Sequence, residues 1–426
     1  MFNWKNSFLF FYIINLTLIL WLIINGSQLS TLSLYLIGLT SYLNAICVLV
    51  SVNSIKTNIN LFLVFIFLLH AILCGIFITS SILIFYILFE ASLIPMFLLV
   101  IGWGSRLERS RAAYYLFFYT FISSILMLLS IVKLYILTGT LNIEIMTYTN
   151  IPIFYQKWGM ACMFIAFSVK IPMIPFHIWL PQAHVEAPLA GSILLAGIML
   201  KLGAFGFIRL ALPLYPYTFY YYSPILLFLS LLSILYGGLS TIRQSDMKRL
   251  IAYSSVAHMG FATYALFNPL NIEMGLVGCI LILIAHGFAS PALFSVVGFL
   301  YERYHTRIIK YYNGVGQIMP MLGVYAFLFT LCSIAFPGSL NFVGEFMIVI
   351  LASQYAYSHG FMMFIGCLVG LIYALYFYQR IFTGSLSIYL TKGKDLNREE
   401  FLTLLLLFLP VLGLGIYPYH LIIALF

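Results

Sequence analysis

Five ionisable side chains stand inside long apolar runs of the sequence: Glu90, Lys170, Lys201, His286 and Glu345. Carboxylates, amines and imidazoles are the groups that exchange protons in proteins. Burial disfavours the charged carboxylate and the charged amine and brings their protonation equilibria closer together, so they can exchange protons near neutral pH. Their alternation predicts a proton relay that runs along the plane of a membrane.

Such residues are costly to keep in lipid. Each charge at the bilayer centre costs at least about 2.5–3.5 kcal/mol, so two glutamates and two lysines cost on the order of 10 kcal/mol. A structural role, in which the charges hold helices together, competes with this interpretation. Buried ion pairs add little stability over apolar replacements of similar volume, so function is the better explanation.

Three histidines are further candidates for the relay. His177 follows Lys170 by seven residues and would share its helix face if the intervening prolines leave the helix intact. His184 lies in the predicted turn HVEAP, and His258 lies in SVAHMG. A packing or loop role is the alternative for each of them, and His258 ranks below His177 and His184 as a relay residue. No HExxH or CxxC spacing occurs, so we expect no metal site, and no phosphate-binding glycine motif supports a nucleotide site.

The composition defines the elements that must carry these residues. Hydrophobic residues make up 63% of the 426-residue chain and charged residues only 7%, whereas soluble domains carry roughly 25% charged residues. A soluble fold is therefore excluded. Apolar runs of about 20 residues each predict about thirteen transmembrane helices. These spans cover residues 8–24, 30–52, 59–78, 81–101, 112–137, 158–180, 188–212, 223–242, 250–267, 275–300, 317–352, 361–383 and 401–424.

Two of these spans contain helix breakers. The eleventh is too long for one straight crossing and contains Pro337 and Gly338, and the sixth contains Pro172 and Pro175. Proline removes a backbone donor, which lipid cannot replace, so both breaks should face protein or a polar interior. No small-residue cleavage site follows the first span, so we expect it to be a helix rather than a removed leader.

The basic residues predict the orientation. If the spans alternate, fifteen of the twenty Lys and Arg side chains lie on one side, which predicts that the amino terminus faces the positive-inside compartment and the carboxyl terminus the other. The loop sequences RQSDMKR and ERYHTRIIK are predicted to be solvated and to set this topology, with headgroup contact as an alternative. The fifteen are Lys5, Lys56, Arg106, Arg109, Arg111, Arg243, Lys248, Arg249, Arg303, Arg307, Lys310, Arg380, Lys392, Lys394 and Arg398.

The spans also suggest an internal duplication. Residues 59–212 and 223–383 each hold five spans, and an odd number of spans gives the second set the opposite orientation. The broken helix is the fourth span in both sets, a pattern typical of transporters. The expected organisation is therefore amino-terminal helices in 1–58, two inverted repeats, and a carboxyl-terminal helix in 401–426.

Six segments resemble the chain 4 family of NADH–ubiquinone oxidoreductase, the antiporter-like proton-pumping membrane subunits of respiratory complex I. They are LFEASLIPMFLLVIGWGSR, FSVKIPMIPFHIWLPQAHVEAPLAGSILLAGIMLKLGAFGFIRL, SDMKRLIAYSSVAHMGF, IAHGFASPALF, LYERYHTR and FPGSLNFVGEFMI. The resemblance covers about residues 30–424. It implies an all-helical antiporter-like fold with two inverted five-helix repeats. Family members usually have fourteen helices, so one amino-terminal helix is expected to be missing.

The resemblance also implies residue roles. Glu90 pairs with Lys170, and Lys201 links along a central polar axis toward Glu345, with His286 on the same axis. His177 and His184 match the family pattern HxWLPxAH.

The function implied by the resemblance is proton translocation driven by quinone reduction in other subunits of complex I, in the mitochondrial inner membrane. NADH, FMN, iron–sulfur clusters and ubiquinone are then bound elsewhere, and this chain binds no cofactor. The expected partners are the other subunits of the complex, chains 2 and 5 above all, and membrane lipids with cardiolipin as a candidate, but no nucleic acid. The alternatives are a subunit of a cation/proton antiporter, a plastid or bacterial homologue, and a scaffold subunit that does not pump.

Overall fold

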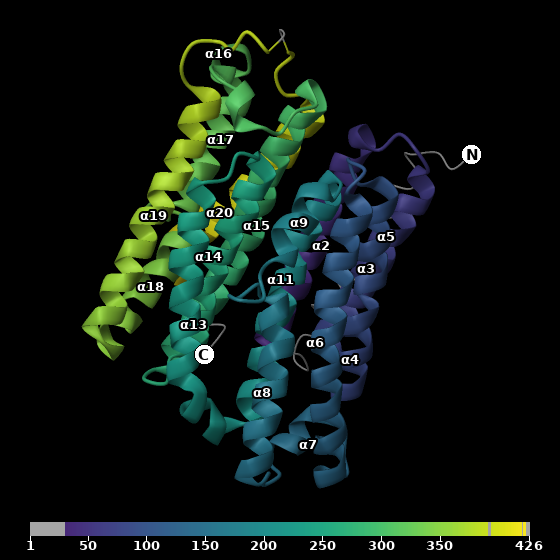
Figure 1. The fold of residues 1–426 in the computed structure, drawn as a ribbon, viewed down its shortest axis with the longest axis vertical. Helices are drawn as coiled ribbons and strands as arrows, with labels where there is room; N and C mark the ends of the chain where they lie inside the picture. The colour runs from purple at the N-terminus through teal and green to yellow at the C-terminus, as the bar shows by residue number, and fades with distance from the viewer. Residues whose placement is uncertain (1–29, 391–392, 420, 423–426) are drawn as a thin grey trace.

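The computed structural model describes residues 30–390, 393–419, 421 and 422. They form long helices that run along the long axis of the molecule (Figure 1). The first half comprises α2 (Thr31–Ser54), α3 (Ile59–Ile78), α4 (Ile82–Ala91), α5 (Leu93–Trp103), α6 (Arg109–Thr138), α7 (Ile143–Thr147), α8 (Ile153–Lys170), α9 (Trp179–Glu186), α10 (Leu189–Leu194), η2 (Leu195–Met199), α11 (Leu200–Gly206), η3 (Phe207–Ala211) and α12 (Leu212–Leu214). The second comprises α13 (Pro216–Ile242), α14 (Met247–Phe267), α15 (Ile272–Tyr304), η4 (Ile309–Tyr311), α16 (Val315–Ile318), α17 (Pro320–Ser333), α18 (Leu340–Tyr355), α19 (Tyr357–Phe382) and α20 (Arg398–Ile416).

The all-helical membrane fold predicted from the sequence is confirmed. Ten helices in the described residues are long and apolar enough to cross a membrane, and α17 and α18 are shorter apolar helices. The first predicted span, 8–24, lies outside the described residues. Helix α13 begins at Pro216 rather than at residue 223, because proline is well tolerated in the first turn of a helix and the tyrosine-rich turns that follow continue it.

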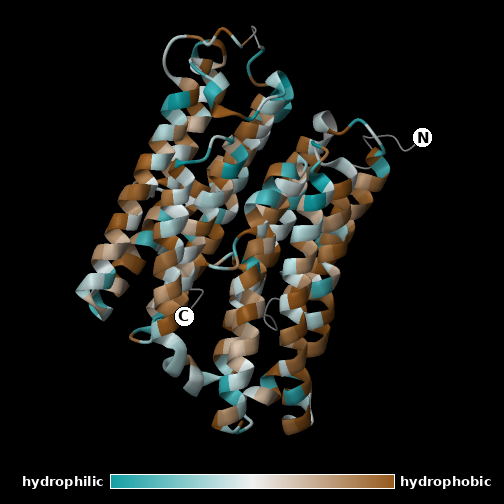
Figure 2. Ribbon diagram, in the orientation of Figure 1, coloured by the Kyte–Doolittle hydropathy of each residue, from teal (hydrophilic) through white to brown (hydrophobic). Residues whose placement is uncertain are grey.

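Helix α15 forms the centre of the molecule. Every residue from 277 to 300 is buried, and the helix packs against α10, α14, α17, α18 and α20. The outer helices instead expose apolar side chains, for example Ile122 of α6 and Phe361 of α19. Hydrophobic residues, drawn brown, predominate along the ribbons of the bundle (Figure 2). This inversion is expected for a bundle whose surroundings are hydrocarbon rather than water.

Both predicted helix breaks are present. Helix α8 ends at Lys170 and α9 begins at Trp179, while α17 ends at Ser333 and α18 begins at Leu340. Side chains replace lost backbone partners in both places. The Trp179 indole donates to the Val169 carbonyl at 2.8 Å, and the Asn341 amide donates to the Cys332 carbonyl at 2.7 Å. Side chains thus satisfy one backbone carbonyl at each break, although Pro175, Phe336 and Pro337 are exposed on the surface of this chain.

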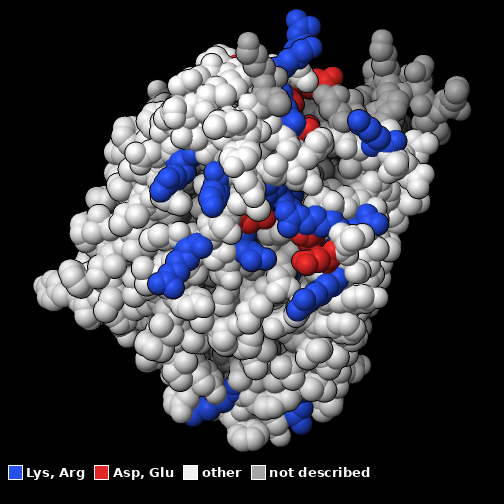
Figure 3. Space-filling model, turned by 45° about the horizontal axis from the view of Figure 1, so that its top comes forward, with Lys and Arg blue, Asp and Glu red and all other residues white. Residues whose placement is uncertain are grey.

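Loops from both halves meet at one end of the molecule. The backbone amide of Ser105 donates to the Glu186 carbonyl, that of Ile309 to Ser245, and that of Gly314 to Thr383. The described basic loop residues belong to these loops and the adjoining helix ends, and charged side chains gather on the end that is turned forward in Figure 3. The opposite end is much poorer in charge, with Lys133 and Lys157 stacked on tyrosine rings.

Candidate functional site

Lys201 is the central residue of the site. It lies on α11, between the π-helical segments η2 and η3, and is fully buried. π-Helical turns are rare and occur often at functional sites. The Lys201 ammonium donates to the Ala196 carbonyl in η2, and its Nζ lies 3.1 Å from Nδ1 of His286 on α15. The π-helical distortion thus provides the lysine with a backbone acceptor beside its imidazole partner.

The contacts continue from His286 toward Glu345. The rings of His286 and His258 are 5.8 Å apart between their centres, and His258 Nδ1 lies 3.2 Å from the Glu345 carboxylate. The Tyr373 hydroxyl completes the environment of His258, at 3.2 Å from Nε2. Lys201, His286, His258 and Glu345, which we name the central row, thus follow one another across α11, α15, α14 and α18. All four are at most 8% exposed, so each is removed from bulk water.

Glu90 and Lys170, which we name the outer pair, are arranged differently. Their charges are close enough to act on one another through space. None of the ion pairs within 4.0 Å in the described residues joins them, however. Glu90 Oε1 and Lys170 Nζ are both without a hydrogen-bond partner. Lys170 Nζ instead lies 4.4 Å above the centre of the Phe89 ring, in cation–π geometry. The pair expected from the family resemblance is therefore open in this structure.

A glycine brings the helix of Lys201 against the helix of Lys170. A Cβ atom at Gly203 would lie 2.5 Å from a side-chain atom of Ile171 and 2.8 Å from the Phe167 carbonyl. Only glycine permits so close an approach without displacement of the backbone. Helix α11 is therefore packed directly on the end of α8, which places the outer pair beside the start of the central row.

Two histidines differ from their sequence predictions. His177 does not share a helix face with Lys170, because residues 171–178 form turns rather than helix. It packs edge-on against Tyr236 and Tyr253 instead. His184 lies on helix α9 rather than in a turn, is fully buried, and stacks on Phe294 with ring centres 4.5 Å apart. Both of its ring nitrogens are without a hydrogen-bond partner.

The sequence predicts that the two charged loops are solvated, but the structure buries one basic side chain of each loop. Arg307 is fully buried, and its guanidinium donates to the Val185 carbonyl and lies 3.4 Å from the Glu186 carboxylate and 3.8 Å from the Asp246 carboxylate. The Lys248 ammonium is buried too and donates to the Ala187 carbonyl at 2.9 Å. Nothing in the sequence distinguishes Arg307 from its exposed neighbours, because its partners lie on distant segments. This cluster, which we name the basic junction, connects the end of α9 to the start of α14 and the loop after α15.

Metal-ligating groups are not clustered in this part of the chain. Within the described ranges, no three His, Cys, Asp or Glu side chains are arranged to hold a metal ion. The site is therefore described by its proton-exchanging side chains.

Comparisons with known proteins agree with this architecture. Residues 79–372 match the family described as NADH:quinone oxidoreductase/Mrp antiporter, TM. The chain is 47% identical to NADH-ubiquinone oxidoreductase chain 4 of Metridium senile, with 91% of this chain and 78% of the relative covered. The corresponding protein of Arabidopsis thaliana is 41% identical over the same shares of the two chains.

Solved structures share the fold. A chain of respiratory complex I from Thermus thermophilus superimposes with a TM-score of 0.85 at 30% identity, over 93% of this chain and 83% of that chain. A chain of the Mrp complex from Dietzia sp. DQ12-45-1b has a TM-score of 0.83 at 18% identity, over 93% and 82% of the two chains, which shows a shared fold alone. The chain therefore belongs to the chain 4 family of NADH–ubiquinone oxidoreductase and is an antiporter-like membrane subunit of respiratory complex I.

Proposed function

We propose that the chain translocates protons through the central row, driven by quinone reduction in other subunits of the complex. The observation that carries this proposal is the series of buried contacts from Lys201 through His286 and His258 to Glu345. Four titratable groups in sequence, each within direct or single-water reach of the next, form a path for protons. Four buried groups of this kind would be an expensive way to hold helices together.

Each transfer can be written at named atoms. Protonated Lys201 gives an N–H proton to Nδ1 of His286 across 3.1 Å and becomes a neutral amine. The His286 imidazolium, whose Nε2 has no hydrogen-bond partner, passes its Nε2 proton through one bridging water to Nε2 of His258, where the water takes the place of the Tyr373 hydroxyl during the step. His258 then releases its Nδ1 proton to the Glu345 carboxylate across 3.2 Å. Tyr373 orients the His258 ring from the opposite nitrogen.

The outer pair regulates proton release from Lys201. When Glu90 and Lys170 form a close pair, the positive charge of Lys170 is neutralised locally, and when the pair opens that charge acts on its surroundings. Helix α11 packs against the end of α8 at Gly203, so the charge is felt by Lys201 through a region of low dielectric. An open pair favours proton release from Lys201, and a closed pair favours proton uptake.

The wider setting follows from the family. We place the chain in a mitochondrial inner membrane, with its basic loops on the matrix side, the amino terminus among them, and chains 2 and 5 of the complex as neighbours. NADH, FMN, the iron–sulfur clusters and ubiquinone belong to other subunits. The two breaks, at 171–178 and 334–339, support the division into inverted repeats at 59–212 and 223–383.

Substitution of Lys201 tests this function against the scaffold alternative. Complex I that contains Lys201→Met should assemble and lose proton pumping in reconstituted vesicles, because the side chain that accepts and releases the proton is gone. Lys201→Arg should fail as well, since a guanidinium stays protonated in proteins. Lys133→Met, which removes a lysine that stacks on Tyr155 at the opposite end, is the matched control and should pump normally.

Pumping at the parental rate by both Lys201 variants would exclude the relay and favour a scaffold subunit. Pumping by Lys201→Arg alone would show that the residue acts as a fixed charge. Transport that requires sodium in the parent complex would instead favour a cation/proton antiporter.

A further inference from the structure

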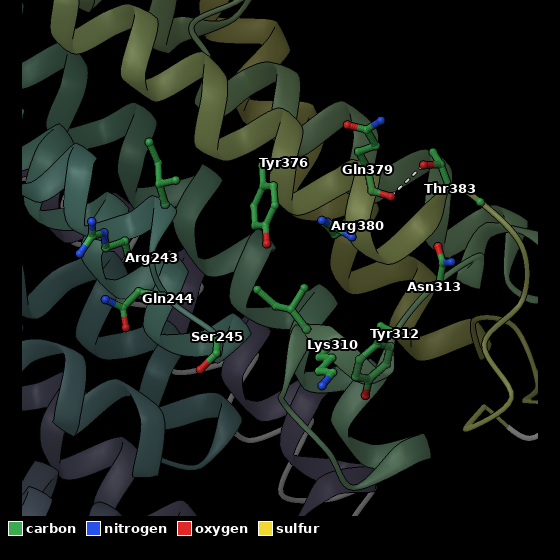
Figure 4. A pocket seen from close by; sticks show the side chains of 13 residues that line it. Arg243, Gln244, Ser245, Lys310, Tyr312, Asn313, Tyr376, Gln379, Arg380 and Thr383 are labelled. Carbon is green, nitrogen blue, oxygen red and sulfur yellow. Dashed lines mark hydrogen bonds between the residues drawn. The ribbon is translucent and has the colours of Figure 1, made fainter.

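A large pocket opens at the basic end of the second half, away from the central row. Its volume is about 760 Å³, which lies in the range of ligand sites. The walls come from the end of α13 and the loop after it, the η4 segment, and the last turns of α19. Figure 4 shows Tyr376 between Arg243 on one side and Arg380 on the other, with Lys310 below.

The charge of this pocket has one sign. Arg243, Lys310 and Arg380 line it, and no carboxylate does. None of the three forms an ion pair in the part of the chain that the structure describes. In contrast, Arg303 and Arg307 nearby are both paired with carboxylates. The pocket thus combines three unneutralised cations from three separate segments.

The three cations are more than is needed to neutralise the partial negative charges at the carboxyl-terminal ends of the neighbouring helices. Helices α13 and α19 both end at the pocket, and each carboxyl-terminal end contributes roughly half a negative charge. Three positive charges therefore leave an excess of about two. Polar neutral groups share the pocket, among them Gln379 and Asn313. This set of donors suits a phosphate group, which accepts several hydrogen bonds and carries negative charge.

The position of the pocket identifies the source of the phosphate. Helices α13 and α19 are long enough to span a membrane and pack side by side, so the pocket lies where the hydrocarbon ends and the headgroups begin. Within about three turns of these ends, Tyr236 and Leu239 of α13 and Ile372 and Leu375 of α19 expose 55%, 58%, 52% and 40% of their surface. An acyl chain can lie on such side chains, whereas a free phosphate gains nothing from them.

We propose that this pocket binds the phosphate group of an anionic phospholipid, with the acyl chains against α13 and α19. Arg243, Lys310 and Arg380 hold the phosphate, while Gln379 and Asn313 donate hydrogen bonds to the headgroup. The role of the site does not depend on the proton relay, because none of its residues belongs to the central row or the outer pair.

The test uses the intact complex in phosphatidylcholine vesicles that contain a photoactivatable phosphatidylglycerol. We expect crosslinks to peptides from the ends of α13 and α19. The triple variant Arg243→Gln, Lys310→Gln, Arg380→Gln should lower the apparent affinity by roughly fivefold for each cation, on the order of 10²-fold in all. A control triple variant, Lys56→Gln, Arg106→Gln, Lys394→Gln, removes the same charge at the same end and should change the affinity by less than about twofold. The three single Gln variants, expected to lose about fivefold each, give the same answer if the triple variant does not assemble.

Two further experiments distinguish a phospholipid from free phosphate as the ligand. Replacement of both arginines by lysine keeps the charge and should keep most of the labelling. Inorganic phosphate should compete poorly, and equal competition would indicate a site for free phosphate and overturn the lipid assignment. Unchanged labelling in the triple Gln variant, or crosslinks from these peptides to an acidic segment of another subunit in place of lipid, would overturn the proposal.

Discussion

The central row consists of four buried titratable groups and the outer pair of a buried lysine and a partly buried glutamate, and the connections within the two regions differ. In the central row, Lys201 and Glu345 each contact a histidine at 3.1–3.2 Å. In the outer pair, Glu90 Oε1 and Lys170 Nζ have no hydrogen-bond partner. Histidine accounts for the contacts of the central row, because each of its two ring nitrogens can hydrogen-bond to a different helix. The central row therefore carries the proton path that we propose, whereas in the same proposal the outer pair changes its separation.

The largest effect should come from disruption of the basic junction, which connects the end of α9 to the start of α14 and the loop after α15. Arg307→Gln removes one of the two buried cations of the basic junction and leaves Glu186 and Asp246 without their arginine partner. The loss of one partner of a buried charged cluster costs about 3–5 kcal/mol, so we expect little assembled complex on native gels. Arg249→Gln, at an exposed arginine in the first turn of α14, is the control and should assemble in greater amount. Equal assembly of both variants would contradict a structural role for the junction.

Within the central row, Glu345→Gln should abolish most pumping while the complex still assembles. Glutamine keeps the volume and can hydrogen-bond to His258 but cannot take up its proton. We expect a loss on the order of 10²-fold, the lower range for removal of a general acid–base group. The measurement is the ratio of protons pumped to NADH oxidised in vesicles. Glu273→Gln, in the first turn of α15 and outside the row, is the matched control.

The outer pair should be more tolerant. Glu90→Gln removes a charge that modulates the row without carrying the proton, so we expect a reduction of about tenfold, equal to about 1.4 kcal/mol. Glu90→Asp retains the charge and should be milder. If both variants pumped like the parent, the outer pair would have no part in control. If Glu90→Gln were as severe as Glu345→Gln, the distinction between the two regions would be lost.

The smallest effect is expected at the edge of the central row. Tyr373→Phe removes one hydrogen bond, to His258 Nε2, and leaves the proton path itself complete. A single hydrogen bond contributes about 0.5–1.5 kcal/mol, so pumping should fall by roughly two- to tenfold. Tyr376→Phe on the same helix, outside the row, should have no effect. An unaltered rate for Tyr373→Phe would show that Glu345 alone orients His258.

The helices and both breaks could be predicted from the sequence. Every helix that crosses hydrocarbon must have about the same length, and its backbone N–H and C=O groups must find hydrogen-bond partners within the protein. The sequence also indicated Lys201, His286 and Glu345 as candidates, because a titratable residue within an apolar run can be recognised without knowledge of its contacts. Arg307 and the open state of Glu90 and Lys170 could not be predicted, because both depend on distances between segments far apart in the chain. The sequence ranked His258 below His177 and His184, because its contacts with Glu345 and Tyr373 come from distant segments.

The π-helical segment before Lys201 makes this part of the chain sensitive to the number of residues as well as to their identity. A π turn accommodates one more residue than an α turn, so η2 contains one residue that a regular helix would not need. A deletion of one residue within 195–199 would restore the regular α-helical hydrogen-bond pattern, in which each carbonyl is used by the amide four residues further on, so that the Ala196 carbonyl would no longer be free to accept from Lys201. The ammonium would then keep its chemistry but lose its alignment with the Ala196 carbonyl or with His286. We therefore expect substitutions at exposed positions of the bundle to be far better tolerated than a single-codon deletion at this one turn.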